Sequence, residues 1–320
     1  MGIASKKRLQ DAVKERPLLS DGAMGTQLMA AGLEQGNCGE EWNLTHPGLV
    51  LAIHRRYAEA GAECILTNTF GASRIMLNRH SNGAAVTEIN RAAVEIARQA
   101  FDGRSGYVIG DMGPFGGLME PYGHFTEGEV REAFDEQARA LVCAGADAII
   151  IETQTSIEEL VLGIEAAKLA GARCVIGSMA YDVTLDGSTF RTMMGVDPEH
   201  AAAVIEAHGG DIVALNCGTG MDMARAREAV ERYRKVTSLP VMVQPNAGQP
   251  KLVNLKVLYD ETPQQMAIGV TPLLEAGANL IGACCGSTPE HIRAFRKVMD
   301  EYLGAAVAPR MDESTGMKRD

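Results

Sequence analysis

Short apolar runs rich in Val, Ile, Leu and Ala recur along the chain, and each ends in a Gly, Asn or Asp turn. Each run leads into a stretch whose apolar residues are spaced three and four apart, as on one face of a helix. The eight runs are LLSDGAMG (18 to 25), AECILTNTFG (62 to 71), GYVIGDMG (106 to 113), DAIIIET (147 to 153), CVIGSMAYD (174 to 182), DIVALNCG (211 to 218), PVMVQPNAG (240 to 248) and NLIGACCG (279 to 286). Eight strand-then-helix units predict an α/β fold, a single-domain (β/α)8 TIM barrel.

The main alternative is a doubly wound open sheet. The nucleotide fingerprint GxGxxG is missing after the first run, and the cysteine motifs of the sixth and eighth runs converge more easily in a closed barrel. We therefore expect residues 1–303 to form the barrel. Residues 304–320, GAAVAPRMDESTGMKRD, lack apolar periodicity and are expected to form a flexible tail.

Composition narrows the class of protein. The chain has 320 residues and a net charge of −11, and no cluster of Lys and Arg forms a basic stripe, so we expect no nucleic-acid partner. It contains no run of about 18 uncharged apolar residues, and its N-terminus has no apolar signal core, so we expect no membrane segment. Seven cysteines, an odd number in a large chain, favour reduced thiols and a cytoplasmic location.

Three of the cysteines follow apolar runs directly. Cys217 ends the sixth run, and the adjacent Cys284 and Cys285 end the eighth. In a barrel all three would lie at the carboxyl ends of strands, where such folds build their sites. Three thiolates suit a zinc ion that keeps one position open for an incoming thiol. Taken singly each cysteine is better explained as a buried core thiol, but the common placement favours a metal site.

Two acidic residues also end apolar runs. Asp21 lies in LLSDGAMGT and Glu152 in DAIIIETQT. A buried carboxylate is costly without a cationic partner, so both positions suggest a ligand with an ammonium group, while backbone N–H groups of the DGAMGT turn could hold a carboxylate. A thiol-bearing amino acid meets all these demands. The simpler interpretations are a helix cap for Asp21 and a water-bound strand end for Glu152.

The motifs DGAMGT, TNTFGAS, IIIET, LNCGTG, QPNAG and GACCGSTPEHI together resemble, in this order, the zinc-dependent homocysteine S-methyltransferases. The resemblance covers roughly residues 15 to 300. It implies one zinc per chain on the three cysteines, with homocysteine bound to it as thiolate and methylated to methionine. It implies no catalytic residue beyond that thiolate. The residues it assigns to the homocysteine pocket are Asp21, Gly22, Ala23, Thr69, Phe70, Glu152 and Asn246.

The resemblance leaves the methyl donor open among betaine, S-methylmethionine and a methyl-corrinoid, which would come on a separate protein because no cobalamin-binding module follows here. Betaine-using relatives of the mammalian type carry a zinc-ligating tyrosine where this chain has Gly71, so the resting fourth ligand must be Asn246, another group or water. Trp42 and Tyr122 are the candidates for an aromatic cage around a quaternary ammonium donor, although packing explains each equally well.

One alternative function is a component of a multi-protein corrinoid-dependent demethylation system that uses another donor or thiol. A metal sensor or store without turnover is the other alternative, and it would not need the two carboxylates.

Overall fold

The computed structural model describes residues 6–253 and 256–307 and contains one parallel sheet of eight strands in the order β1-β12-β9-β8-β5-β4-β3-β2. The ring closes between the first and last of these strands. There Ser20 and Cys64 form an isolated parallel β-bridge, and the Glu63 N–H donates to the Leu19 carbonyl at 2.7 Å. The strands are β1 (Leu18–Leu19), β2 (Cys64–Leu66), β3 (Tyr107–Met112), β4 (Ala148–Gln154), β5 (Val175–Met179), β8 (Ile212–Asn216), β9 (Val241–Gln244) and β12 (Leu280–Ile281). Each begins within one of the eight apolar runs, and β4 alone passes the end of its run, by the single residue Gln154, so the predicted TIM barrel is confirmed.

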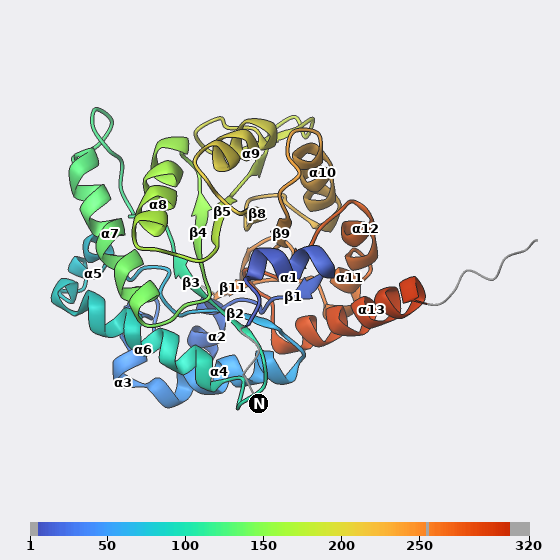
Figure 1. Ribbon diagram of the computed structural model, residues 1–320, viewed down its shortest axis with the longest axis horizontal. Helices are drawn as coiled ribbons and strands as arrows, with labels where there is room; N and C mark the ends of the chain where they lie inside the picture. Colours follow the sequence, from blue (N-terminus) through green and yellow to red (C-terminus); the bar gives the residue numbers. More distant parts are fainter. Residues whose placement is uncertain (1–5, 254–255, 308–320) are drawn as a thin grey trace, which may run out of the picture.

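Helices surround the strands (Figure 1). They are α2 (Gly25–Ala30), α3 (Trp42–Thr45), α4 (Pro47–Glu59), α5 (Arg74–Asn78), the 3-10 helix η1 (Gly83–Ala85), α6 (Val86–Gln99), α7 (Glu127–Cys143), α8 (Ile157–Leu169), α9 (Pro198–Ala207), α10 (Met223–Arg234), α11 (Pro263–Ala267), α12 (Val270–Glu275) and α13 (Pro289–Val307). Two small hairpins, β6 (Asp182–Val183) with β7 (Phe190–Arg191) and β10 (Lys251–Val253) with β11 (Lys256–Leu258), extend loops after β5 and β9. The long helix α7 starts with a capping box in which Thr126 and Glu129 bond each other's backbone N–H.

Helix α1 (Leu9–Glu15) lies across one end of the barrel (Figure 1). Its Leu9 and Val13 are buried in one apolar cluster with the side chains that fill the barrel interior, among them Ile150, Ile176 and Met242. The Asn279 side chain donates to the Val13 carbonyl at 3.3 Å and fixes the helix against β12. The amino-terminal end of the barrel is therefore closed, and the carboxyl-terminal end is left for a site.

The end of the barrel differs slightly from the expected boundary at residue 303. Helix α13 continues to Val307, so residues 304–307 of the expected tail are helical, and alanine at 305 and 306 favours this extension. Residues 308–320, the rest of that tail, lie outside the described residues. Within the described ranges, none of the helices combines the length and the apolar character needed to cross a membrane.

Candidate active site

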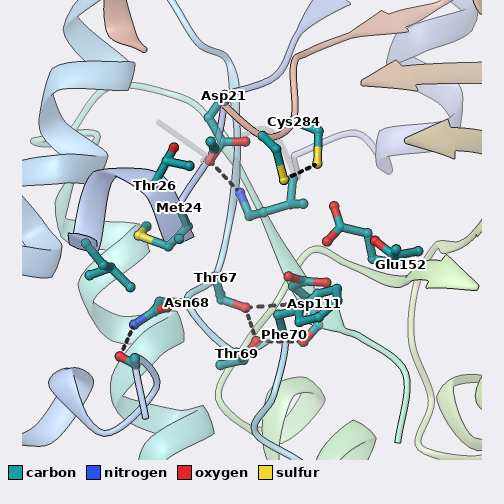
Figure 2. Close-up of a pocket in the computed structure, with 18 of the residues that line it drawn as sticks. Asp21, Met24, Thr26, Thr67, Asn68, Thr69, Phe70, Asp111, Glu152 and Cys284 are labelled. Carbon is teal, nitrogen blue, oxygen red and sulfur yellow. Dashed lines mark hydrogen bonds between the residues drawn. The ribbon is translucent and has the colours of Figure 1, made fainter. Parts of the chain in front are cut away.

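A cavity of about 360 Å³ opens at the carboxyl ends of the barrel strands. Its wall is built from the carboxyl ends of seven of the eight strands, all except β5, or from the loops that follow them. Figure 2 shows the side chains of Asp21, Asp111, Glu152 and Cys284 around the same space. The barrel therefore brings together the acidic residues and the cysteines that the sequence placed at separate strand ends.

The three cysteines converge in this cavity. Their sulfur atoms all lie within 4.8 Å of one another, and Cys284 Sγ and Cys285 Sγ are 3.9 Å apart. Four ligands at about 2.3 Å around a tetrahedral zinc would place sulfurs about 3.8 Å apart, so small movements suffice. This group of three thiols could bind a metal ion.

The thiols influence one another's ionisation. Hydrogen bonds from Cys284 and Cys285 stabilise the Cys217 thiolate and lower the pKa of that thiol. The same hydrogen bond to Cys217, the neighbouring Cys285 thiol and burial raise the pKa of Cys284 well above its usual value. One thiolate therefore forms easily and the next does not. A metal dication supplies the positive charge that would let all three sulfurs ionise.

Asn246 follows β9 and faces the same sulfurs. Its Nδ2 donates to Cys217 Sγ at 3.6 Å and to the Gly218 carbonyl at 3.4 Å. Its Oδ1 is buried without a hydrogen-bond partner among the described residues. Asn246 thus lies beside the cysteines, as the family resemblance implies, and has one oxygen to offer.

Asn216 at the end of β8 also supports the cysteines, and sequence reasoning did not find it. Its Oδ1 accepts from the Thr153 N–H at 3.0 Å and from Ser178 Oγ at 2.6 Å. Its Nδ2 donates to Thr153 Oγ1 at 2.6 Å and approaches Cys284 Sγ at 3.9 Å. Thr153 and Cys217 both have φ of +56°, a conformation that residues with a Cβ rarely adopt. The Asn216 amide holds Thr153 directly through hydrogen bonds, and Asn216 precedes Cys217 in the chain.

Asp21 and Glu152 both line the cavity. The Asp21 Oδ2 accepts from the Leu66 N–H at 3.0 Å, yet burial raises the pKa of this carboxyl to about 8. Burial, with Cys217 and Asp21 nearby, also raises the pKa of Glu152 to about 8. No Lys, Arg or His is among the described residues that line the cavity. A ligand that brings its own positive charge is the natural partner for these carboxylates.

The turn after β1 packs tightly on the loop that follows the cysteine pair. A Cβ on Gly22 would lie 2.5 Å from Ser287 Oγ, so only glycine fits there. The Ala23 N–H already donates to Ser287 Oγ at 2.9 Å, which leaves it unavailable for a substrate carboxylate. Thr26, which the sequence analysis did not single out, lines the cavity with a buried Oγ1 that has no partner among the described residues.

Thr69 belongs to a closed ring of three hydrogen bonds. Thr69 Oγ1 donates to the Asp111 carbonyl at 2.7 Å, the Asp111 N–H donates to Thr67 Oγ1 at 3.0 Å, and the two hydroxyls are 2.6 Å apart (Figure 2). Because the Thr69 proton is committed to the carbonyl, Thr67 must donate to Thr69. Thr69 therefore fixes the backbone of β3 beside the cavity.

Aromatic side chains contribute little to the cavity. Phe70, 38% exposed, is the one aromatic residue among its described lining residues, whereas Trp42 and Tyr122 are not in the wall. Trp42 packs instead against His46, with ring centroids 4.7 Å apart. Position 71 could not carry a tyrosine without rearrangement, because a Cβ there would lie 2.8 Å from the Glu40 carboxylate, which accepts the Gly71 N–H at 2.8 Å.

Comparisons with known proteins agree with this geometry. The sequence profile of the family described as homocysteine S-methyltransferase matches residues 18–299. The methionine synthase of Mycobacterium tuberculosis is 34% identical over 300 residues, and that of Mycobacterium leprae is 35% identical over 302 residues. Both alignments cover 89% of this chain but only 25% and 24% of the relatives, so the chain spans about a quarter of their length.

A solved structure shares the fold. The homocysteine methyltransferase MmuM of Escherichia coli, in its metallated form, superimposes with a TM-score of 0.74 over 90% of this chain and 99% of that one. The two sequences are 23% identical, so this likeness speaks for the barrel architecture.

Proposed function

Since the chain belongs to the homocysteine S-methyltransferase family and is therefore a methyltransferase, we propose that it moves a methyl group from an activated donor to the sulfur of homocysteine, giving methionine. The observation that carries the proposal is the convergence of three thiols within 4.8 Å in a cavity whose wall also holds carboxylates and no cationic side chain among its described residues. The thiols of this cavity suit a metal and a sulfur, and its carboxylates suit an ammonium group.

The metal we propose is one zinc ion per chain, held by Cys217, Cys284 and Cys285. The donor set fits, because three thiolates at tetrahedral spacing leave zinc one open position. Zinc bound there would lower the pKa of the homocysteine thiol and keep its sulfur nucleophilic at neutral pH. The chain then needs no general base for the transfer itself. The Asn216 and Asn246 amides keep the cysteine sulfurs in position through their contacts at 3.9 and 3.6 Å.

The carboxylates orient the substrate. Asp21 and Glu152 bind the ammonium group of homocysteine, and the Thr26 hydroxyl is suited to donate to its carboxylate. Held at both ends, the substrate directs its sulfur toward the cysteines and the mouth of the cavity. The sulfur then attacks the methyl carbon, a new S–C bond forms, and the donor leaves with the electrons of the broken bond. Orientation of this kind is the main contribution of the protein's own residues.

The methyl donor is betaine, S-methylmethionine or a methyl-corrinoid carried by a separate protein. A quaternary ammonium donor is normally surrounded by several aromatic rings, and Phe70 is the one aromatic among the described lining residues. This observation, together with the similarity to two methionine synthases, favours the corrinoid protein as donor. The same observation keeps a second candidate function open, in which the chain is one component of a corrinoid-dependent demethylation system acting on another donor or thiol.

All seven cysteines are free thiols, which suits a reducing compartment, so we propose that the protein is cytoplasmic.

The test is a donor panel. Zinc-loaded protein is incubated with L-homocysteine and, separately, betaine, S-methylmethionine, methylcobalamin or a methylated corrinoid protein, and methionine is quantified. We expect methionine with at least one donor and none with the Cys285→Ala variant. If no donor gives methionine, while another thiol is methylated or another methyl compound is demethylated, the second function takes its place.

A further inference from the structure

A third carboxylate lies in the cavity wall, that of Asp111 in β3. Asp111 is 5% exposed, and its Oδ1 has no hydrogen-bond partner among the described residues. Its backbone, in contrast, is held on both sides by the hydroxyls of Thr67 and Thr69, and Gln137 Nε2 reaches its carbonyl at 3.3 Å. The fold thus immobilises the main chain of Asp111 and leaves the side chain free to meet a ligand (Figure 2).

The surroundings of Asp111 make an empty site unfavourable. Burial, followed by the charges of Glu152, Asp21 and Glu40, raises the pKa of Asp111 well above its usual value. Two of these neighbours have partners already, because Asp21 accepts from the Leu66 N–H and Glu40 from the Gly71 N–H. Asp111 has no such partner for Oδ1. A buried carboxyl oxygen without a partner persists at a cost, and such groups gather where a ligand completes them.

We propose that Asp111, together with Glu152, binds the ammonium group of the amino-acid substrate and so determines the preference for a thiol that carries an α-amino group. This inference rests on the proposed function and names a residue for its substrate site. An ammonium group has three N–H donors, and Asp111, Glu152 and the remaining lone pairs of Asp21 can accept all three. Asp111 is then a specificity-determining residue rather than a structural one.

The experiment compares two ligands on zinc-loaded protein by titration calorimetry. One is L-homocysteine, and the other is 4-mercaptobutyrate, which is homocysteine without its amino group. We expect Asp111→Asn to weaken homocysteine binding by on the order of 10- to 100-fold and to leave 4-mercaptobutyrate binding unchanged, since only a charged hydrogen bond is lost. Glu40→Gln is the matched control, because it removes one negative charge from the same wall at a residue that is already partnered, and it should leave the preference intact.

The amide of Asp111→Asn could still accept a hydrogen bond from the ammonium group, so Asp111→Ala is measured as a second variant. Thermal unfolding without ligand checks that both variants fold. Equal weakening of both ligands, or no weakening of either, would overturn the assignment of Asp111. A different result, wild-type protein that binds the two ligands equally or not at all, would count against the proposed function itself. The two failures are therefore distinguishable.

Discussion

At the scale of single residues, the site contains carboxylates that are costly to bury. A positively charged ligand would compensate this cost. Asp21 and Glu152 were identified in the sequence because each ends an apolar run. Asp111 carries the same signal in GYVIGDMG and could have been found by the same reasoning. Asn216 and Thr153 could not, because their importance lies in a positive φ and in hydrogen bonds between strands, which appear only after folding.

The raised pKa values of Asp21 and Glu152, both about 8, predict that homocysteine affinity increases as the pH rises from about 6 to about 8. Below their pKa these carboxyls hold protons in the empty site, and they must lose them to receive an ammonium group, so the complex binds fewer protons than the free protein. Calorimetry at several pH values, in buffers of different ionisation enthalpy, measures the protons released. Since 4-mercaptobutyrate shares the thiol ionisation but lacks the ammonium group, an identical pH dependence for both ligands would contradict the prediction.

We expect Glu152→Gln to weaken homocysteine binding by about 1.5 to 3 kcal/mol, the loss typical of a hydrogen bond to a charged group. Zinc content should not change, because Glu152 is not among the proposed ligands. Calorimetry and metal analysis of the same preparation check both statements. Unchanged affinity would mean that the ammonium group is held elsewhere.

Replacing Cys285 by alanine should abolish zinc retention and methyl transfer, because two thiolates and one protein amide hold zinc far less tightly than three thiolates. The exposed Cys143, which lies outside the cavity, provides the control variant Cys143→Ala. Metal analysis should give about one zinc per chain for the control and only background for Cys285→Ala. Circular dichroism should be alike for both. Zinc retained by Cys285→Ala would refute the ligand assignment.

At the scale of elements, the sequence predicted where strands occur better than where they end. Each apolar run contains a strand, but β1 and β12 are two residues long, since the remainder of their runs turns into the loops that carry Asp21 and the cysteine pair. The hairpins of β6 with β7 and β10 with β11 were not predicted. Such excursions depend on contacts with neighbouring loops, as in the Val183 N–H donating to the Thr219 carbonyl at 2.9 Å, and these contacts leave no periodic signal in the chain.

The loop after β8 predicts a difference between two glycines. Gly218 and Gly145 have nearly the same φ, +89° and +91°, but a Cβ on Gly218 would lie 1.8 Å from the Tyr181 carbonyl, whereas a Cβ on Gly145 meets nothing within 4 Å. Gly145→Ala should cost about 1 to 2 kcal/mol of unfolding free energy from φ alone. Gly218→Ala should cost more and, by displacing the adjacent Cys217, also weaken zinc binding. Urea unfolding and zinc competition with a chromogenic chelator would show this, and equal effects of the two substitutions would argue against it.

At the scale of the whole molecule, we expect the barrel core to be independent of the metal, but the proposed metal site would join two parts of the ring. Cys217 follows β8 and the cysteine pair follows β12, with β9 lying between these strands in the sheet. A bound ion therefore links two strands that are not neighbours. The apolar side chains inside and around the barrel are buried without it.

Removing zinc with a chelator should lower the midpoint of thermal unfolding by roughly 5 °C, since a ligand that binds only the native state at 100 times its Kd contributes about 2.7 kcal/mol. The far-ultraviolet circular dichroism at 25 °C should stay the same. Differential scanning calorimetry with and without chelator measures the shift. Complete unfolding on chelation would mean that the barrel needs the metal to fold, contrary to this expectation.

The closed amino-terminal end of the barrel has a kinetic consequence. Because α1 seals that end with Leu9 and Val13, a molecule lodged against the cysteines can enter and leave through one doorway only. On the proposed function, the methyl donor would approach through the same opening and block it while bound. If the proposed function holds, homocysteine would bind before the donor, and methionine would leave after the spent donor. This order of binding and release is an ordered sequential mechanism. It would follow from a short helix that lies at the opposite end of the barrel from the cysteines.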